Sequence, residues 1–286
     1  MATQVKNSTT KFLCEKPKDL KKSVIKYAGG KNYPAFLNKI KPLWDIAKMA
    51  NPDVRLVETC SGAANVAISL KPNYALLIDI NPDLIDFFNW IKTDGIVHID
   101  FENTETWYYQ ARERFNTTYS KIEKSQLFYY LNKTCFNGLC RYNKNKIFNV
   151  PYGHYSKVEY RYDFSDYRYL FQNWEFLCSD FEEVTSHFRT SDFIYVDPPY
   201  DFLPSKKAFT TYAGNQFLYE DQYRLAQMVS EHKGTAVASN LATDRMVDLY
   251  KEKGFTIDYL TAPRRISANG DRNSVLEIFA VKNQIS

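Results

Sequence analysis

The stretch of sequence that decides the fold is DFIYVDPPY, which runs from Asp192 to Tyr200. Its short apolar part is typical of a buried β-strand. Two consecutive prolines cannot continue a sheet, because proline lacks the N–H group that a strand ladder requires. We therefore expect the chain to leave the sheet here, at the carboxyl edge, where ligands bind in open α/β sheets. A rigid turn would satisfy the two prolines alone, so the flanking Asp197 and Tyr200 carry the functional interpretation.

Apolar segments on both sides of this stretch predict further strands. Besides Phe193–Val196, they are Val54–Glu58, Ala75–Asp79, Thr235–Ser239, Thr256–Leu260 and Val275–Val281. Helical patterns lie between several of them: Asn81–Lys92, Leu218–His232, and Thr243–Lys253, the last of which closes at Gly254. Strands that alternate with helices favour an α/β fold with a doubly wound, mostly parallel sheet.

The alternation breaks between about Trp90 and Asn173. Two helical segments, Glu105–Asn116 and Lys121–Lys133, are followed there by a stretch rich in Asn, Gly and Tyr. We interpret this region as an inserted, largely helical part with a β-hairpin, suited to substrate recognition. The predicted organisation is a flexible lead-in over residues 1–20, a catalytic domain formed by residues 21–92 and 174–286, and a target-recognition domain over residues 93–173.

Composition disfavours several classes of protein. A hydrophobic content of 44% is enough for a packed core, and the chain shows no apolar run of signal-peptide or membrane-spanning type. The five cysteines include no CxxC pair and the four histidines are far apart, which disfavours a zinc site or a disulfide framework. We expect a soluble cytoplasmic protein with reduced thiols and no metal, as a monomer or a weak dimer.

The distribution of charge is more informative than its net value of +4. Basic residues gather in three places: eight lysines between Lys6 and Lys31, the cluster Arg141, Lys144 and Lys146, and the cluster Arg264, Arg265 and Arg272. One such cluster alone is more simply a solvated surface, but three of them among turn-forming residues favour a nucleic-acid partner. An aromatic content of 16% fits stacking on bases, although most of these side chains must form the core.

The residues that flank the two prolines suit chemistry on an exocyclic amine. Such an amine is a poor nucleophile, because its lone pair is delocalised into the ring. The Asp197 carboxylate and the Pro198 carbonyl can accept its two N–H hydrogens and so concentrate electron density on nitrogen, while Tyr200 stacks on the base. The turn therefore predicts catalytic roles for Asp197, Pro198 and Tyr200.

Two glycine-containing turns predict a site for an adenosyl cofactor. The first is KYAGGK, residues 26–31, in which a Gly-Gly pair ahead of a helix lets a ligand approach the backbone closely. The second is VETCSGAAN, residues 57–65, and Asp79 lies 21 residues beyond Glu58. A small-residue turn with a carboxylate about 20 residues later is typical of a site that holds a ribose through its hydroxyls. Each turn also has a purely structural explanation, and nothing in the sequence matches a P-loop.

A third constellation lies in the insertion. It comprises NKTCFNGLCRYN, residues 132–143, and FNVPYG, residues 148–153. The Asn-Gly and Pro-Tyr-Gly steps are turn signals, so a plain hairpin is one explanation. An arginine beside an aromatic residue at a hairpin tip, as at Arg141, is also well suited to reading a guanine edge.

Taken in this order, from about Lys26 to Val281, the motifs resemble the Dam-type family of DNA adenine methyltransferases. The resemblance implies a Rossmann-like methyltransferase core, S-adenosylmethionine as cofactor, double-stranded DNA as partner, a nucleoid-associated location, and methylation of adenine N6 in GATC with the adenine flipped out. It implies cofactor contacts from Tyr27, Ala28, Lys31, Glu58, Gly62, Asp79, Asp180, Phe181 and Asp197. It implies DNA contacts from Lys26, Phe136, Asn137, Leu139, Arg141, Asn149, Pro151, Arg264 and Arg265.

The resemblance also assigns positions within GATC to some of these residues. Lys26 corresponds to the contact with the first guanine, and Leu139 and Arg141 to contacts with the third and fourth base pairs. Phe136 and Asn137 would fill or probe the space that the flipped base leaves.

One departure from the family pattern concerns the cofactor turn. The family has Pro-Phe after the motif glutamate and a second glycine two positions past the first, where this chain has Thr59, Cys60 and Ala64. Loss of the aromatic residue removes a stacking partner worth about 1 kcal/mol, so we expect weaker cofactor binding. Two alternatives stay open: an N4-cytosine DNA methyltransferase, since a cytosine amine poses the same problem, and a non-catalytic DNA-binding regulator on the same fold. A restriction-modification partner, a solitary enzyme and a mobile-element role are all compatible with the sequence.

Overall fold

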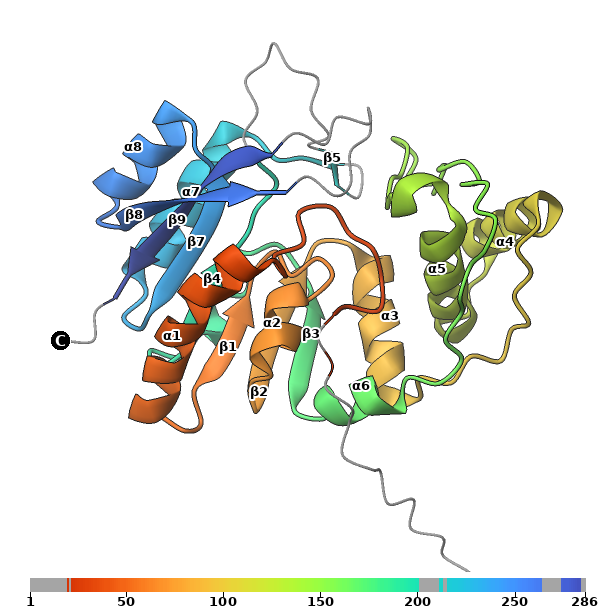
Figure 1. The fold of residues 1–286 in the computed structure, drawn as a ribbon, viewed down its shortest axis with the longest axis horizontal. Coiled ribbons are helices and arrows are strands. Elements are labelled where there is room, and N and C mark those ends of the chain that lie inside the picture. Colours follow the sequence, from red (N-terminus) through yellow and green to blue (C-terminus); the bar gives the residue numbers. More distant parts are fainter. Residues whose placement is uncertain (1–19, 21, 201–210, 213–214, 264–273, 284–286) are drawn as a thin grey trace, which may run out of the picture.

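The core of the protein is a seven-stranded sheet with helices on both faces (Figure 1). The computed structural model describes residues 20, 22–200, 211–212, 215–263 and 274–283. In spatial order the strands are β3 (Trp174–Cys178), β2 (Tyr74–Asp79), β1 (Arg55–Glu58), β4 (Phe193–Val196), β7 (Ala236–Leu241), β9 (Val275–Lys282) and β8 (Thr256–Ala262). The first five are parallel, whereas β9 runs antiparallel to both β7 and β8. The predicted doubly wound, mostly parallel sheet is confirmed.

Two layers of helices cover the sheet. On one face lie α1 (Pro34–Ala50), α2 (Asn65–Leu70) and α3 (Pro82–Thr93), and on the other lie α7 (Tyr219–Glu231) and α8 (Asp244–Glu252). Successive side chains of a strand point to opposite faces. Accordingly, Phe193 and Tyr195 of β4 pack with the first layer, while Ile194 and Val196 pack with the second. Because both faces are covered, the central strands β1 and β4 are buried at every position.

Local sequence signals set the helix boundaries. α3 begins after Asn81, whose side chain accepts hydrogen bonds from the first-turn N–H groups, and Pro82 is its first residue. α8 ends at Glu252, and Gly254 follows with a φ of +82°, the left-handed conformation that glycine adopts without strain. The predicted bounds of both helices are correct to within one residue.

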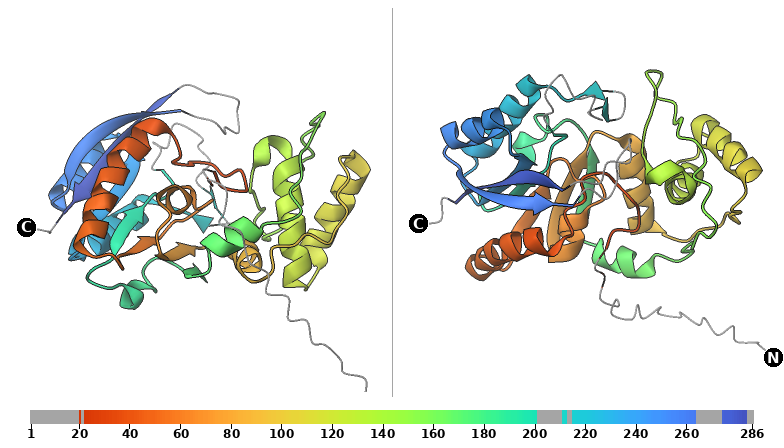
Figure 2. Two further views of the ribbon diagram at one scale, coloured as in Figure 1. Left: turned by 60° about the horizontal axis from the view of Figure 1, so that its bottom comes forward. Right: turned by 45° about the horizontal axis from the view of Figure 1, so that its top comes forward.

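Beyond α3 the chain forms a helical layer of its own. α5 (Lys121–Thr134) packs against both α3 and α4 (Glu105–Thr117). Phe128 of α5 lies between Phe87 of α3 and Phe115 of α4, with ring centroids 5.6 and 6.3 Å away. α4 and α5 lie at the opposite end of the molecule from β8 and β9 (Figures 1 and 2). The helices are present where the sequence predicts them, and their description as a separate domain over residues 93–173 stays a prediction.

Short elements complete the described structure. They are α6 (Ser165–Leu170), which precedes β3, a 3-10 turn at Thr185–His187, and a small antiparallel ribbon of β5 (Thr211–Tyr212) and β6 (Asn215–Gln216).

The hairpin of the insertion joins the two turn-forming stretches, residues 132–143 and 148–153. Phe136–Gly138 forms a 3-10 turn in which Asn137 has a φ of +55°. Antiparallel bridges join Cys135 to Tyr152 and Tyr142 to Phe148. The hairpin is therefore the excursion over residues 135–152, and the segment 136–142 is its outgoing arm.

Candidate active site

Acidic side chains from neighbouring strands gather at the carboxyl edge of the sheet. Glu58 is the last residue of β1, Asp79 is the last residue of β2, and Asp197 directly follows β4. The chain winds outward in opposite directions from β1 and β4, which pair side by side. In doubly wound folds, ligands bind outside the strand ends at such a switch point. β1, which leads into the predicted cofactor turn, and β4, which leads into the predicted catalytic turn, therefore end side by side at the carboxyl edge of the sheet.

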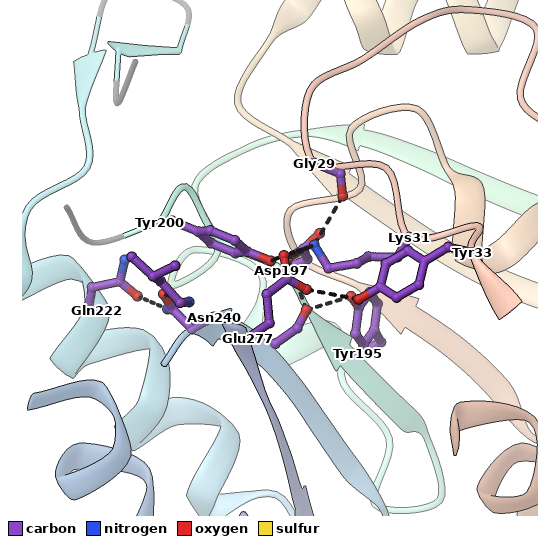
Figure 3. Close-up of polar contacts among 11 residues, drawn as sticks. Gly29, Lys31, Tyr33, Tyr195, Asp197, Tyr200, Gln222, Asn240 and Glu277 are labelled. Carbon is purple, nitrogen blue, oxygen red and sulfur yellow. Dashed lines mark hydrogen bonds and ion pairs between the residues drawn. The ribbon is translucent and has the colours of Figure 1, made fainter. Parts of the chain in front are cut away.

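Asp197 is held by donors that are far apart in the sequence (Figure 3). Its Oδ1 atom lies 3.0 Å from Nζ of Lys31 and accepts a 2.9 Å hydrogen bond from the hydroxyl of Ser239 in β7. The Ser239 hydroxyl shares a further hydrogen bond of 2.7 Å with the hydroxyl of Tyr195. These contacts fix the orientation of the carboxylate, as its predicted hydrogen bond with a substrate amine requires.

A second buried carboxylate, Glu277 of β9, belongs to the same network. Its Oε1 atom accepts a 2.5 Å hydrogen bond from the Tyr200 hydroxyl, and its Oε2 atom accepts one of 3.0 Å from the Tyr33 hydroxyl. Nζ of Lys31 lies 3.6 Å from Glu277 and donates to the Tyr200 hydroxyl at 2.6 Å. Lys31 therefore bridges Asp197 and Glu277 with a side chain that is only 3% exposed. Removal of one member of such a buried group would leave an uncompensated charge, which is strongly destabilising.

Burial and this arrangement of charges set the protonation of the site. Burial raises the pKa of Asp197 to about 6, with Lys31 opposing the increase and Glu277 adding to it. Burial also raises the pKa of the Tyr200 hydroxyl far above its usual value, so that this hydroxyl remains a donor. Asp197 is thus mainly a carboxylate at neutral pH, with a higher proton affinity than an exposed aspartate.

The backbone of the catalytic turn is fixed from another direction. Nε2 of Gln222 in α7 donates a 2.7 Å hydrogen bond to the Pro199 carbonyl, and Nδ2 of Asn240 in β7 donates to Oε1 of Gln222 at 2.8 Å. Both amide side chains are buried, at 1% and 0% exposed, so this chain of hydrogen bonds has little freedom to rotate. The Pro198 carbonyl, the predicted acceptor of the amine, is therefore held at a fixed position relative to Asp197.

Asp79, the predicted ribose carboxylate, also shapes the turn after β1. Its Oδ2 atom accepts a 2.9 Å hydrogen bond from the N–H of Gly62, and its Oδ1 atom accepts one of 2.9 Å from the N–H of Asn81. Burial raises the pKa of Asp79, and the two hydrogen bonds counteract that increase. Gly62 has a φ of +46°, and a Cβ atom there would lie 3.1 Å from the ring of Tyr27. The two predicted cofactor turns are therefore in contact with each other.

Glu58 supports the cofactor turn from behind. Its Oε1 atom accepts a 2.6 Å hydrogen bond from the N–H of Ala67, in the first turn of α2, and the residue is 2% exposed. Burial raises the pKa of Glu58 to about 8, against the effect of the Ala67 hydrogen bond and with a contribution from Asp197. This is the geometry of an acid that caps a helix, and a direct contact of Glu58 with a cofactor stays a prediction.

Ala64 has the unusual backbone of this turn. Its φ of +54° and ψ of +31° are left-handed, and its side chain is wholly buried. The left-handed region costs an L-residue roughly 1–2 kcal/mol, whereas glycine enters it freely. Ala64 occupies the position at which the resembled family has glycine, and its backbone has the left-handed conformation that glycine adopts without strain.

The residues at this edge fit an adenosyl cofactor that carries a sulfonium. Gly29 has a φ of +82°, and a Cβ atom there would stand 4.0 Å from Oδ2 of Asp197, so glycine keeps the approach to this oxygen open. Burial raises the pKa of the Cys60 thiol, and the negative charges of Asp79, Asp197 and Asp180 raise it further. Carboxylates suit both a sulfonium cation and ribose hydroxyls.

Asp180 and Phe181 follow β3 at the same edge, two and three residues past Cys178, which pairs with Asp79. Oδ1 of Asp180 accepts a 3.0 Å hydrogen bond from the N–H of Glu182. Phe181 is 4% exposed and belongs to the hydrophobic core on the α7 and α8 face. Of the two residues, Asp180 is therefore the better placed to contact a cofactor, because the Phe181 side chain is buried in the core.

The predicted DNA contacts of the insertion lie on the hairpin 135–152. Phe136 is 43% exposed, whereas Leu139 is 7% exposed. Arg141 donates from Nε to Oδ1 of Asn149 at 3.1 Å and from a terminal nitrogen to the Asn149 carbonyl at 3.4 Å. The Pro151 carbonyl accepts a 2.9 Å hydrogen bond from the N–H of Phe136. Asn149 and Pro151 thus orient Arg141 and the 3-10 turn.

The remaining predicted site residues fall in different places. Lys26 lies beside the hairpin, with its Nζ atom 4.6 Å from the ring centroid of Tyr155, and Ala28 is half-buried. Arg264 and Arg265 lie outside the described residues. A direct role for each predicted contact stays a prediction.

Sequence reasoning misses several residues of the network around Asp197, namely Tyr33, Tyr195, Gln222, Ser239, Asn240 and Glu277. Glu277 does carry a signal, because it is a single acid within the apolar strand VLEIFAV, and a buried charge requires a partner. The others belong to no recognisable motif.

Over the described part of the chain, no three or more His, Cys, Asp and Glu side chains are grouped so that they could hold a metal ion. No helix within those same ranges combines the length and apolarity needed to cross a membrane.

A doubly wound sheet with an Asp-Pro-Pro-Tyr turn at its switch point defines the class, a Rossmann-like methyltransferase. The chain belongs to the family of D12 class N6 adenine-specific DNA methyltransferases, whose family model matches residues 27–266. It is therefore an enzyme that methylates adenine in DNA, which decides against the N4-cytosine alternative and the non-catalytic regulator.

Similar proteins cover nearly the whole chain. The DNA adenine methylase of Vibrio cholerae is 34% identical over 274 residues, which are 91% of this chain and 95% of that protein. The DNA adenine methylase of Haemophilus influenzae is 34% identical over 282 residues, with 93% and 95% covered. The DNA N-6-adenine-methyltransferase of Escherichia phage P1 is 32% identical over 285 residues, which are 95% of this chain but 37% of that protein.

Proposed function

We propose that this enzyme transfers the methyl group of S-adenosylmethionine to N6 of an adenine in GATC, with the adenine turned out of the double helix. The observation that carries the proposal is the position of Asp197 at the switch point, beside Lys31 and at the edge that also bears Asp79. An amine gripped by Asp197 would face a cofactor whose ribose is held by Asp79. S-adenosylmethionine supplies an electrophilic methyl group at its sulfonium.

The residues of the catalytic turn prepare the amine. Oδ1 of Asp197 is engaged by Lys31 and Ser239, so the carboxylate presents Oδ2 to the substrate. Oδ2 and the Pro198 carbonyl accept the two N–H hydrogens, which raises the electron density on nitrogen. The product amine has lost one proton, and Asp197, with a pKa raised to about 6, is able to accept it.

Three features support extrusion of the adenine. The side chain of Asp197 is 16% exposed, and an amine stacked within a duplex cannot reach a carboxylate that is recessed in this way. Tyr200 is anchored through its hydroxyl by Glu277, which leaves its ring to stack on an extruded base. Phe136, exposed at the hairpin, is available to fill the gap in the helix.

Single-turnover methylation of a GATC duplex tests the catalytic assignment. Asp197→Ala should lower the rate by roughly 10²–10³, by analogy with the loss of an oxyanion donor. Asp258→Ala is the matched control, because Asp258 is an exposed aspartate of β8 that pairs with Lys39. Near-normal turnover of Asp197→Ala would remove the basis of the mechanism.

The cofactor and the site are tested separately. Calorimetry with S-adenosylhomocysteine should show a weaker affinity for Asp79→Asn than for the wild-type enzyme, because the ribose loses a charged acceptor.

Sequencing of methylated DNA from cells that express the enzyme should show modified adenines within GATC. Arg141→Ala should relax the choice at one base pair by about 1–3 kcal/mol, whereas uniform weakening on all sequences would make Arg141 a phosphate contact.

A further inference from the structure

Asn132 joins two segments that are far apart in the sequence. Its Oδ1 atom accepts a 2.8 Å hydrogen bond from the N–H of Lys26, and its Nδ2 atom donates to the Lys26 carbonyl at 2.7 Å. The same Nδ2 atom lies 3.4 Å from the Gly138 carbonyl, in the 3-10 turn of the hairpin. Asn132 is 1% exposed, and a buried amide with this many partners has a single orientation. It therefore fixes Lys26 relative to the hairpin.

Packing reinforces this contact. A Cβ atom on Gly138 would lie 2.6 Å from Cδ and 2.8 Å from Cβ of Lys26, so the aliphatic stem of Lys26 rests directly on the glycine backbone. Gly138 has a φ of +65°, which glycine adopts without strain. This close packing fixes the position of the Lys26 side chain relative to the 3-10 turn.

The other end of the same short segment reaches the catalytic turn. Five residues after Lys26, Lys31 lies 3.0 Å from Oδ1 of Asp197 and donates to the Tyr200 hydroxyl. Between them, the ring of Tyr27 lies against Gly62 of the cofactor turn. Only four residues separate Lys26 from Lys31, so a shift of Lys26 is expected to move Lys31 relative to Asp197 and Tyr200.

We propose that Asn132 is a positioning residue that sets the register between the recognition hairpin and the segment 26–31, so that correct reading of the DNA aligns Lys31 and Asp197 for methyl transfer. This proposal rests on the proposed function, because it takes the hairpin and Lys26 to be the DNA-reading elements. Asn132 is buried, and it acts on the site through its contacts with Lys26 and Gly138.

The chain offers a matched control. Asn116 of α4 makes the same two-point pairing with the backbone of Phe148: it accepts from the Phe148 N–H at 3.0 Å and donates to the Phe148 carbonyl at 3.1 Å. Its partner lies on the returning arm of the hairpin, away from the segment 26–31. Asn132→Ala and Asn116→Ala therefore both remove a two-point pairing with one backbone residue, and only Asn132→Ala also removes the contact with Gly138 and the link to segment 26–31.

The experiment measures kcat on the preferred site, kcat/KM for that site against duplexes with a single altered base pair, and urea unfolding of each variant. Asn132→Ala should lower kcat by about 10- to 100-fold, as expected for reacting groups displaced by about 1 Å, and should lower discrimination at the outer base pair nearest Lys26. Asn116→Ala should lose stability yet keep kcat within about threefold and keep that discrimination. Equal effects of the two changes, or an unchanged Asn132→Ala enzyme, would overturn the proposal.

A second variant approaches the contact from the hairpin. Gly138→Ala places a methyl group against the stem of Lys26 and leaves Asn132 intact, so it should reproduce the loss of kcat and of discrimination even where Asn132→Ala fails to fold. A folded Gly138→Ala enzyme with wild-type kcat and discrimination would contradict the proposal. Failure of the proposed function is distinguishable, because the wild-type enzyme would then show no preference between GATC and altered duplexes.

Discussion

Nζ of Lys31 lies 3.0 Å from Oδ1 of Asp197, and this buried ion pair connects the glycine turn at the start of the chain to the catalytic turn. Lys31 opposes the effect of burial on the pKa of Asp197, which would otherwise rise further above about 6. A protonated Asp197 can offer one acceptor fewer to the substrate amine. The cation therefore keeps the acceptor ionised under the conditions in which the enzyme works.

The first prediction concerns Lys31→Met, which removes the charge and keeps an unbranched side chain. The pKa of Asp197 should rise, because burial and Glu277 then act without opposition, and the acid limb of kcat/KM should move to higher pH by about one unit or more. In the wild-type enzyme that limb should fall as pH drops through about 6, where burial places the pKa of the carboxylate. Rate profiles from about pH 5 to about pH 9 measure the shift. Lys39→Met is the control, since Lys39 pairs with Asp258 at the surface, and an equal shift in both variants would refute the assignment.

A second prediction concerns the coupling of Tyr200 to Glu277. The Tyr200 hydroxyl donates to Oε1 of Glu277, so Tyr200→Phe and Glu277→Gln each weaken the same contact. Their effects on kcat should be non-additive, with a coupling energy of about 1–3 kcal/mol in a double-mutant cycle. Tyr250→Phe provides the comparison, because its hydroxyl is buried without a hydrogen-bond partner among the described residues. Additive effects in the Tyr200 cycle would show that Glu277 does not act through that hydroxyl.

The fold was largely predictable from local signals. The strand Phe193–Val196 was delimited correctly because an apolar run ends abruptly at two prolines. By contrast, β3 is a short strand with the burial pattern of an edge, and its exposed Glu175 weakens the apolar signal that would have identified it. α1 contains Pro42, which disfavours a helix interior, yet the helix continues to Ala50 because its buried face packs in the core. Tertiary packing overrides local propensity there.

The site residues that belong to a sequence motif were predictable, whereas those that reach the site through strand pairing or long-range contacts were not. Asp79 ends its strand and Asp197 directly follows another, so their place at one edge follows from chain direction alone. Glu277 reaches the site only because β9 runs antiparallel beside β7, and no local pattern fixes the direction or register of that strand. Asn132 was visible in the insertion motif, but its partner Lys26 lies 106 residues away. Long-range partners of this kind have no signature in a single sequence.

A third prediction uses the protonation of Glu58. Its pKa is about 8 in the folded protein and near 4.5 when unfolded, so between these values folding takes up a proton and stability falls as pH rises. Glu58→Gln keeps a carbonyl oxygen for the Ala67 N–H and removes this dependence. The variant should gain stability relative to the wild type as pH rises from about 5 to about 8, and the difference should level off above that range. Urea unfolding at several pH values measures it, and a constant difference across the range would mean that Glu58 is ionised in the fold.

The last prediction tests the strained turn by comparing two buried alanines. Ala64 has a φ of +54°, whereas Ala67 is helical, and both side chains are 0% exposed. Replacing either by glycine loses a buried methyl group, worth about 0.8 kcal/mol, and increases the entropy of the unfolded chain by a similar free energy. Only at position 64 does the change also relieve left-handed strain of roughly 1–2 kcal/mol. Ala64→Gly should therefore leave the free energy of unfolding nearly unchanged, while Ala67→Gly lowers it by about 1–2 kcal/mol. If urea unfolding showed the same loss of free energy of unfolding for Ala64→Gly and Ala67→Gly, the backbone at position 64 would carry no strain.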